Sequence, residues 1–283
     1  SQGVHRINAM ELANVINRTL RRGGNLVIPA FAVGRTQEML IYQGIKERKL
    51  VEFDFPVYVD SPLAIELHPF FNKNFQSCFD EEAMALIQSG ISHPFSESPP
   101  AISSDESKAI NFDSTPKVII SASGMCEAGR IKHHLKHQSV EAGVYFLFVG
   151  YQAYGTLGRA LTEGAEYVKL FGETIEVKAE LAQLDGVSGH ADKNGLLHWV
   201  GAFSPKPQMV FVVHGEDETC DHFAECLTDE HQIPALHHSP ALFDLATGEW
   251  IKEGLKDPCS SRKSLQQNAD PIFMPVYRAG KRL

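Results

Sequence analysis

The sequence lacks the long apolar segments of membrane and secreted proteins. No apolar run approaches the ~18 residues that a membrane-spanning helix needs, so we expect no membrane span. Residues 1–8 contain no apolar signal-peptide core. The absence of an initiator methionine leads us to expect that an upstream part has been removed. Hydrophobic residues make up 43% of the 283 residues, which argues against wholesale disorder.

Cysteine and basic charge are also scarce. The five cysteines include no C-x-x-C pair, which excludes a zinc knuckle and a thioredoxin-like motif. Scattered cysteines fit a reducing environment, so we predict a cytoplasmic protein. A total of 26 Lys and Arg against 35 Asp and Glu gives a net charge of −9, which argues against a general basic coat for nucleic acid. This charge does not exclude nucleic-acid binding through a local basic channel or through a metal that neutralises a phosphate.

Short apolar runs alternate with amphipathic segments along most of the chain. The predicted strands are apolar and cover residues 25–30, 56–60, 117–121, 144–149 and 209–213. The predicted helices have helical spacing of apolar residues and lie near residues 12–20, 36–46, 131–135 and 196–200. This alternation indicates an α/β protein with a parallel-type sheet flanked by helices. Ligands bind just beyond strand ends in such folds, which makes the loops there the first functional candidates.

Other segments depart from this alternation. Residues 92–116 are rich in Ser and Pro and predict a long loop or an irregular crossing. Residues 167–184 alternate apolar and polar side chains, which predicts a hairpin and a change of architecture near residue 165. Residues 252–283 lack periodicity and predict a loosely ordered tail.

Two histidines stand at the ends of predicted elements. His190 precedes the helix near residues 196–200, which Asp192 is placed to cap. It is either a packing or capping loop residue or a general acid, because histidine releases protons near neutral pH. His214 ends the apolar run of residues 209–213, so it is either a satisfied core histidine or a metal ligand.

Other histidines carry weaker signals. His133 and His137 have the spacing of metal ligands on a helix, but the sequence HHLKH lacks the glutamate of a zinc-protease helix. We therefore predict that His133, His134 and His137 are solvated helix residues. The pair at 237–238 is predicted to lie on the surface.

Loops of small residues offer candidate phosphate contacts. Ser121, Ser123 and Gly124 lie between a predicted strand and a predicted helix, where backbone N–H groups can cradle a phosphate. Arg35 and Arg159 each end a glycine-containing loop, where a guanidinium can clamp a phosphate. The alternatives are a tight turn without a ligand and a helix-start arginine paired with a surface carboxylate.

Seven of these segments, taken in order, resemble the motifs of the β-CASP family of metallo-β-lactamase-fold nucleases. They read IPAFAVGRTQE (28–38), VDSPLA (59–64), SASGMCEAGRIKHHL (121–135), GYQAYGTLGRAL (150–161), VKLFGE (168–173), GVSGHAD (186–192) and VVHGE (212–216). Each motif alone is weak, but their order makes the resemblance strong. It is closest to the prokaryotic RNA nucleases of a family that also includes the eukaryotic pre-mRNA 3′-end-processing endonuclease.

The resemblance implies a zinc-dependent ribonuclease. It places His190 at the family's general acid and His214 at a ligand of one of two zinc ions. Ser188 falls where relatives contact the phosphate. The implied reaction is hydrolysis of an RNA phosphodiester by a zinc-bridged hydroxide, with His190 protonating the departing ribose oxygen.

The family's main metal motif, H-x-H-x-D-H, does not occur in the sequence. We therefore expect a C-terminal portion of a longer enzyme: a β-CASP domain over residues 1–164, the closing half of a metallo-β-lactamase αββα sandwich over 165–251, and a tail over 252–283. One histidine cannot hold a dinuclear zinc site, so we expect the chain alone to be inactive. It would need the missing N-terminal metallo-β-lactamase half or a partner supplying it, and a homodimer stays open.

Two other functions remain alternatives. One is a non-catalytic RNA-binding or scaffold homologue, against which the retained His190 and His214 argue mildly. The other is a small-molecule metallo-hydrolase, against which an inserted domain that clamps a nucleic-acid strand argues.

Overall fold

The computed structural model divides the chain into two compact units, Ser1–His190 and Ala191–Leu283. It describes residues 2–41, 50–52, 54–78, 81, 84, 103–184, 191–237, 242–244, 247 and 249–252. Of the predicted tail over residues 252–283, only Lys252 lies within the described residues.

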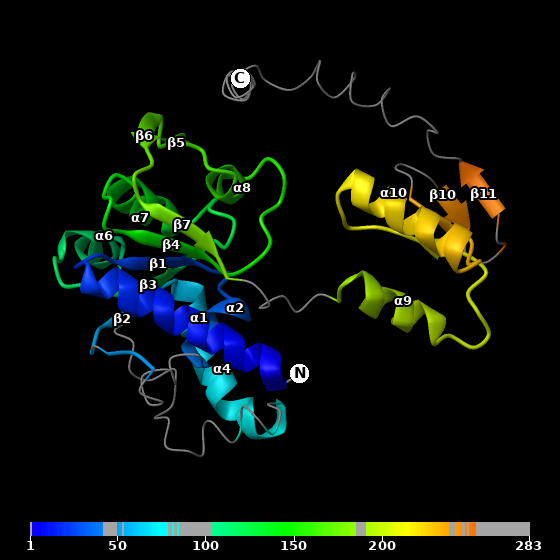
Figure 1. Ribbon diagram of the computed structural model, residues 1–283, viewed down its shortest axis with the longest axis horizontal. Coiled ribbons are helices and arrows are strands. Elements are labelled where there is room, and N and C mark those ends of the chain that lie inside the picture. The colour runs from blue at the N-terminus through cyan, green and yellow to red at the C-terminus, as the bar shows by residue number, and fades with distance from the viewer. Residues whose placement is uncertain are drawn as a thin grey trace. The chain divides into compact units, whose positions relative to one another are not determined.

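A five-stranded parallel sheet forms the centre of the first unit, in the order β2-β3-β1-β4-β7 (Figure 1). Its strands are β1 (Leu26–Pro29), β2 (Val57–Asp60), β3 (Val118–Ser121), β4 (Tyr145–Phe148) and β7 (Glu180–Gln183). The strands β1, β3 and β4 are buried throughout, as expected for a sheet covered on both faces. The predicted parallel-type sheet is therefore confirmed.

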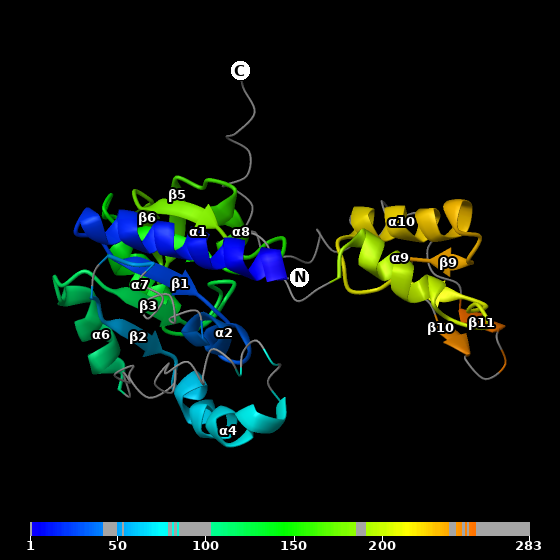
Figure 2. The same ribbon diagram turned by 60° about the horizontal axis from the view of Figure 1, so that its bottom comes forward.

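Helices cover both faces of this sheet (Figure 2). Those on one face are α1 (Gln2–Arg21), α2 (Arg35–Ile41) and α4 (Pro62–Cys78). Those on the other are α6 (Ser104–Phe112), α7 (Ile131–Gln138) and α8 (Leu157–Thr162). Successive strand side chains point to opposite faces, so Ile28 joins the first core while its neighbour Val27 joins the second.

Part of the predicted loop over residues 92–116 is wrong, because α6 lies within it. Ser103 Oγ accepts a hydrogen bond from the Glu106 N–H at 3.1 Å, and the Glu106 carboxylate accepts one from the Ser103 N–H at 2.7 Å. This capping box satisfies two backbone donors at the helix start, and it outweighs the loop-like composition around it.

The predicted hairpin is present, but it does not mark the end of the sheet. The strands β5 (Tyr167–Leu170) and β6 (Glu173–Glu176) pair antiparallel. The chain then enters β7, which pairs parallel with β4. The sheet of the first unit thus continues beyond the predicted boundary at residue 165.

The second unit is smaller and has a core around Val200, Leu227 and Ile233. Its elements are α9 (Lys193–Gly201), β8 (Val210–Phe211), α10 (Asp217–Glu225), a π-helical turn η1 (Cys226–Glu230), β9 (Ala235–Leu236), β10 (Leu242–Asp244) and β11 (Glu249–Lys252). The predicted cap is confirmed, since the Asp192 carboxylate accepts a hydrogen bond from the Gly195 N–H at 2.7 Å. Within the described part of the chain, no helix combines the length and apolar character needed to cross a membrane.

A close backbone contact follows α1, which ends at Arg21 just before Gly23 and Gly24. Gly23 has φ +77°, and the Gly24 N–H bonds back to the Thr19 carbonyl at 3.2 Å. A Cβ on Gly24 would lie 1.7 Å from the Gly143 carbonyl oxygen. A Cβ on Gly143 would instead have its nearest neighbour, the Gly24 Cα, at 3.8 Å.

The two glycines therefore differ in their tolerance of alanine. Gly24→Ala is expected to lower the free energy of unfolding by about 1–3 kcal/mol, because the turns before β1 and β4 must separate. Gly143→Ala should stay within about 1 kcal/mol of the wild type. Urea unfolding of the three proteins measures both effects, and equal losses would contradict the asymmetric contact.

Candidate functional site

The loops that follow the parallel strands lie along one edge of the sheet, because all five strands run in the same direction. We call this the carboxyl edge; its loops are residues 30–34 after β1, 122–130 after β3 and 149–156 after β4. The chain also leaves β7 at this edge, and residues 185–190 follow. Ser188 and His190 lie in that segment, outside the described residues, so their roles stay predictions.

Gly124 is the meeting point of three of these loops. It is buried, and a Cβ there would lie 3.0 Å from the Phe31 ring and 3.1 Å from the Phe31 nitrogen. Its carbonyl accepts a hydrogen bond from Gln152 Nε2 at 3.0 Å. Any larger residue would push the loops apart, so glycine at this position sets the shape of the edge.

The two serines of this loop already have partners inside the protein. The Ser121 hydroxyl is fully buried and donates to the Asp60 carbonyl at 3.1 Å. The Ser123 hydroxyl is half-buried and accepts a hydrogen bond from the Ala128 N–H at 3.3 Å. Both bonds fix the loop, and a phosphate contact by either serine stays a prediction.

Both candidate arginines pair with carboxylates that are close in sequence. Arg35 binds Glu38, and Arg159 Nε donates to Glu163 at 2.6 Å. The arginine paired with a surface carboxylate, weighed as an alternative from the sequence, is thus the arrangement observed. Partly exposed pairs contribute little free energy, so a phosphate can replace either carboxylate at small cost. A phosphate-clamping role for the two arginines therefore stays a prediction.

A buried charged cluster lies beneath the carboxyl edge, and we call it the Asp60 cluster. The Asp60 carboxylate accepts hydrogen bonds from Arg130 and from the Ser107 hydroxyl, both at 2.6 Å. Its Oδ2 also lies 2.7 Å from His134 Nε2. The side chains of Asp60 and His134 are both 0% exposed. The cluster ties the end of β2 to α6 and α7, and α7 directly follows the Gly124 loop.

Hydrogen bonding keeps the Asp60 carboxylate ionised. Burial by itself would raise the pKa of Asp60, but hydrogen bonds from His134, Ser107 and Arg130 outweigh it and lower the pKa below its usual value. A buried carboxylate is tolerated because it is paired and fully hydrogen-bonded.

The prediction that the α7 histidines are solvated is wrong for His134, while His133 and His137 are partly exposed. His134 is fully buried, and its Nδ1 lies 2.8 Å from the Asn111 side-chain oxygen. It shares a helical face with Ile131 and Leu135, which was the missed sequence signal. His133 stacks on the Phe171 ring at 4.7 Å between ring centroids.

Other histidines that the sequence predicts to be solvated are also partly buried. His137 packs edge-on against Phe112, and burial lowers the pKa of both His133 and His137. His237, predicted to lie on the surface, is half-buried and 3.0 Å from Asp221, while His238 lies outside the described residues.

Exposed aromatic rings line the carboxyl edge, and sequence analysis did not single them out. Phe31 is 50% exposed, Tyr151 57% and Tyr154 77%. They belong to the loops after β1 and β4, within two of the matched motifs. Such rings are the side chains on which nucleic-acid bases stack. Burial also raises the pKa of Cys126 in the neighbouring loop to about 12, which argues against a thiol nucleophile here.

His214 lies in the second unit, and its surroundings differ from the prediction. The apolar run before it is not buried, since Val213 is 75% exposed and Phe211 is also exposed. Within the described residues β8 pairs only with β9, which leaves its other side open. The His214 side chain is exposed, and its backbone has φ +66°.

The described residues do not by themselves fit a zinc site at His214. Among them, a group of metal-binding side chains does come together at Cys226, Glu230 and His231, and it does not include His214. A zinc ion needs at least three protein ligands. His214 therefore offers one ligand, and any others must come from outside the described residues.

Exposed apolar side chains gather on α9 and just after its end. Leu196 and Trp199 are exposed on the helix and Phe203 is exposed two residues beyond it, whereas Val200 packs into the core. The Trp199 and Phe203 rings contact each other at 5.0 Å between centroids. We call these three residues the α9 stripe. Clustered apolar surface of this kind is typical of contact sites for other molecules.

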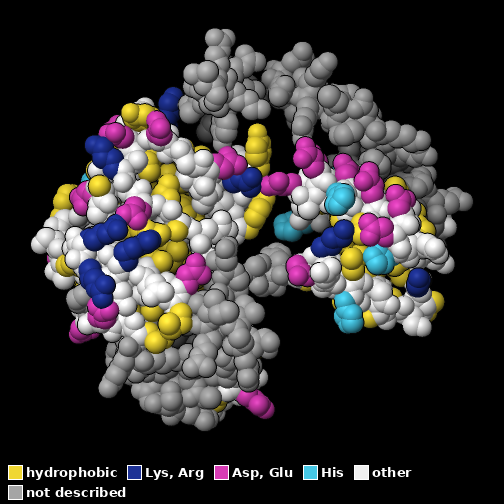
Figure 3. All heavy atoms as spheres, viewed as in Figure 1, with side chains coloured by type: hydrophobic (Ala, Val, Ile, Leu, Met, Phe, Trp, Pro, Cys, Tyr) yellow, Lys and Arg dark blue, Asp and Glu magenta, His cyan; other side chains and the backbone are white. Residues whose placement is uncertain are grey.

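A hollow lies at the opposite, amino edge of the sheet, beside the C-terminal part of α1. It has a volume of about 620 Å³ and is lined by Asn14, Asn17, Arg18, Arg21, Arg22 and Glu52. Figure 3 shows basic side chains gathered on this unit. Arg21 pairs with Glu52, and both Arg18 and Arg22 pair with Glu180. These pairs neutralise much of the basic charge, and none of the residues that line the hollow is a predicted site residue.

Comparison with known proteins defines the class of this molecule. Residues 36–161 match the Beta-Casp domain, and residues 174–237 match the Zn-dependent metallo-hydrolase RNA specificity domain. The chain belongs to the β-CASP family of metallo-β-lactamase-fold nucleases, as its motifs predict. The predicted boundary at residue 165 falls between the matched segments.

Curated relatives are similar over most of this chain. Ribonuclease TTHA0252 of Thermus thermophilus is 35% identical over 219 residues, covering 76% of this chain and 48% of the relative. Transcription termination factor FttA of Pyrococcus abyssi is 34% identical over 220 residues, covering 74% and 33%. An RNase J-like protein of Methanocaldococcus jannaschii is 32% identical over 228 residues, covering 80% and 51%. The chain thus spans between a third and about half of these relatives.

Proposed function

We propose that this chain is the RNA-binding portion of a zinc-dependent ribonuclease and supplies part of its active site. The observation that carries the proposal is the carboxyl edge, where exposed aromatic rings flank the closely packed Gly124 loop. A relative named ribonuclease and a matched domain named for RNA specificity support RNA as the substrate.

Base stacking is the main source of affinity in this proposal. The net charge of −9 opposes a phosphate backbone, so attraction at long range is weak. Stacking contributes about 1–3 kcal/mol per base and needs no net positive charge. Single-stranded bases would lie on Phe31, Tyr151 and Tyr154, while Arg35 and Arg159 exchange their carboxylate partners for phosphates. The loop with Ser121, Ser123 and Gly124, and Ser188 beyond β7, would contact the phosphate nearest the cut.

The catalytic zinc site would be completed from outside the described residues. In this proposal His214 is one ligand of a two-zinc site, and His190 donates the proton to the departing ribose oxygen. The remaining ligands would come from a missing N-terminal metallo-β-lactamase half or a partner supplying it. The α9 stripe is the proposed contact for that half, with a second copy of this chain as the alternative occupant.

We also propose a cytoplasmic location. The described cysteines Cys78, Cys126, Cys220 and Cys226 are free thiols, which suits a reducing compartment.

Binding of labelled single-stranded RNA tests the carboxyl edge. Tyr154→Ala is expected to weaken binding about tenfold, because one stacked base is lost, whereas Tyr154→Phe keeps the ring and the affinity. Tyr167→Ala is the control, since Tyr167 is also an exposed tyrosine, at 53% against 77% for Tyr154, but lies on the β5–β6 hairpin. Equal losses from Tyr154→Ala and Tyr167→Ala would contradict a stacking site at the edge.

The second candidate function is a non-catalytic scaffold, which the incomplete ligand set at His214 favours. Cleavage of the same RNA distinguishes a ribonuclease from this scaffold. The native protein purified from its cell should cleave the RNA, while this chain alone should bind it and leave it intact. Binding without cleavage in both preparations would support the scaffold instead. Cleavage by this chain alone would contradict the need for a completing half.

A further inference from the structure

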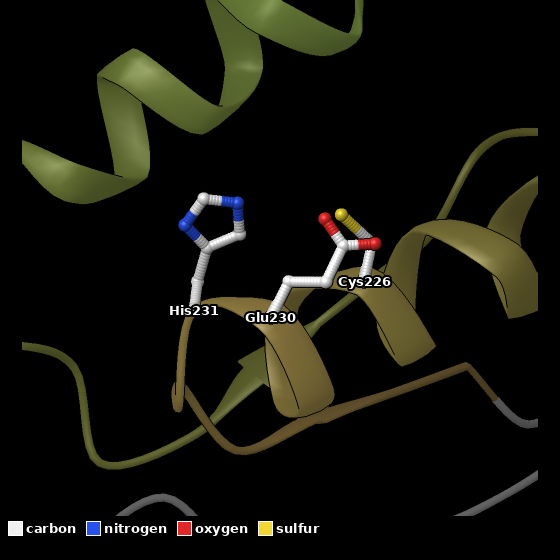
Figure 4. Close-up of side chains that lie close together, drawn as sticks. All are labelled: Cys226, Glu230 and His231. Carbon is white, nitrogen blue, oxygen red and sulfur yellow. The ribbon is translucent and has the colours of Figure 1, made fainter.

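Three side chains of metal-binding type meet where α10 ends in the second unit. The Cys226 sulfur, a Glu230 carboxylate oxygen and a His231 ring nitrogen all lie within 4.8 Å of one another. Figure 4 shows the three side chains on the same side of the backbone. We propose that Cys226, Glu230 and His231 bind one zinc-type divalent cation, at a site that does not include His214.

The π-helical turn brings these residues together. The turn η1 spans Cys226–Glu230, and His231 follows directly. Its hydrogen bonds reach the fifth residue instead of the fourth, so each turn is wider than an α-helical turn. Residues four and five positions after Cys226 therefore both face it. In a regular α-helix only Glu230 would do so, and His231 would point away.

The anchoring of the cluster suits metal binding. Cys226 is only 3% exposed, and the neighbouring Leu227 belongs to the core of the unit, so the sulfur is held in place. Glu230 and His231 are exposed. With bonds of about 2.0–2.3 Å, ligand atoms on a tetrahedral zinc ion lie about 3.3–3.8 Å apart. Rotation of the two exposed side chains about their own torsions can close the remaining gap.

The ligand set selects the kind of cation. A thiolate and an imidazole favour zinc over calcium and magnesium, which prefer oxygen ligands. Three protein ligands leave a fourth position for water or another group. The bound ion would tie Cys226, in the core, to the turn that precedes Ile233, whose N–H already bonds to the Leu227 carbonyl at 2.9 Å. We therefore expect binding to stabilise the second unit.

Cobalt titration tests the site without relying on RNA cleavage. The purified chain is stripped with a chelator, kept reduced with a phosphine and titrated with Co²⁺. A thiolate–cobalt bond absorbs in the near ultraviolet, so we expect this band to grow to one equivalent and to vanish on addition of Zn²⁺. Cys226→Ser should abolish the band, while Cys220→Ser, at an equally buried cysteine of α10, should retain it.

Substitutions at the two exposed ligands test the proposed metal site even if Cys226→Ser unfolds the second unit. Glu230→Gln and His231→Gln should each weaken cobalt binding by about tenfold or more. Their matched controls are Glu225→Gln and His222→Gln, at exposed positions of α10 outside the cluster. No near-ultraviolet band in the wild type, a band that survives Cys226→Ser, or equal losses in ligand and control variants would overturn the proposal.

Discussion

Asp60→Asn is expected to lower the free energy of unfolding by about 3–5 kcal/mol, since it removes one partner from a buried ion pair. Arg130 bonds to Oδ1 and Ser107 to Oδ2, so the single amide nitrogen of asparagine would face one of these two donors, and Arg130 would lose its carboxylate. Loss of this cluster would also loosen α7 beneath the Gly124 loop. Urea unfolding at neutral pH measures the change. A loss below about 1 kcal/mol would contradict a stabilising role for the cluster.

The pH dependence of this effect has a definite sign. The pKa of Asp60 is lowered in the folded protein, so its carboxylate stabilises the fold above the unfolded pKa of about 4. This contribution is lost as the pH falls through the folded pKa. The difference between wild type and Asp60→Asn should therefore shrink in acid. Asp105→Asn, at an exposed position of α6, is the control and should stay within about 0.5 kcal/mol at every pH.

His190→Ala is expected to reduce RNA cleavage by the native protein by about 10²–10⁴-fold, the usual contribution of a general acid. Without a proton donor the ribose oxygen must depart as an alkoxide, which raises the barrier to bond cleavage. RNA affinity should stay near that of the wild type, because the aromatic rings of the carboxyl edge are unchanged. Single-turnover cleavage and RNA binding, measured on the same preparations, separate the two effects.

His222→Ala is the control for this variant, since His222 is an exposed histidine of α10. It should cleave RNA at the wild-type rate. Full activity in His190→Ala would reject the proposed proton donor, although it would leave RNA binding at the carboxyl edge intact. Equal loss of binding and cleavage would instead point to a positioning role for His190.

Local patterns in the sequence were enough to predict most of the first unit. Four of its five parallel strands are short apolar runs, which is typical of a sheet covered by helices on both faces. The sequence predicts each of these four strands near its observed bounds. Strand β7 was missed because Glu180 and Gln183 give it a mixed polar pattern. It lies at the edge of the sheet, where burial constrains side chains less.

The supporting parts of the candidate site depend on contacts distant in sequence. Asp60 and His134 are 74 positions apart, and the sequence around either residue does not predict their contact. Gly124 was chosen as a possible phosphate contact, yet its observed role is to let Phe31 and Gln152 approach. The order of the motifs identified the family, whereas the packing beneath them required the structure.

The α9 stripe bears on how the protein is made. A ribosome releases the N-terminal part of a chain first, and domains fold as they emerge. If the completing half lies upstream in the same chain, it is already folded when Trp199 and its neighbours emerge from the ribosome, and they can pack against it at once. If a separate polypeptide supplies that half, the stripe faces the cell until the partner arrives and is open to chaperones and proteases. Covalent linkage would thus shorten the time for which the stripe is exposed to chaperones and proteases, whatever the final affinity of the contact.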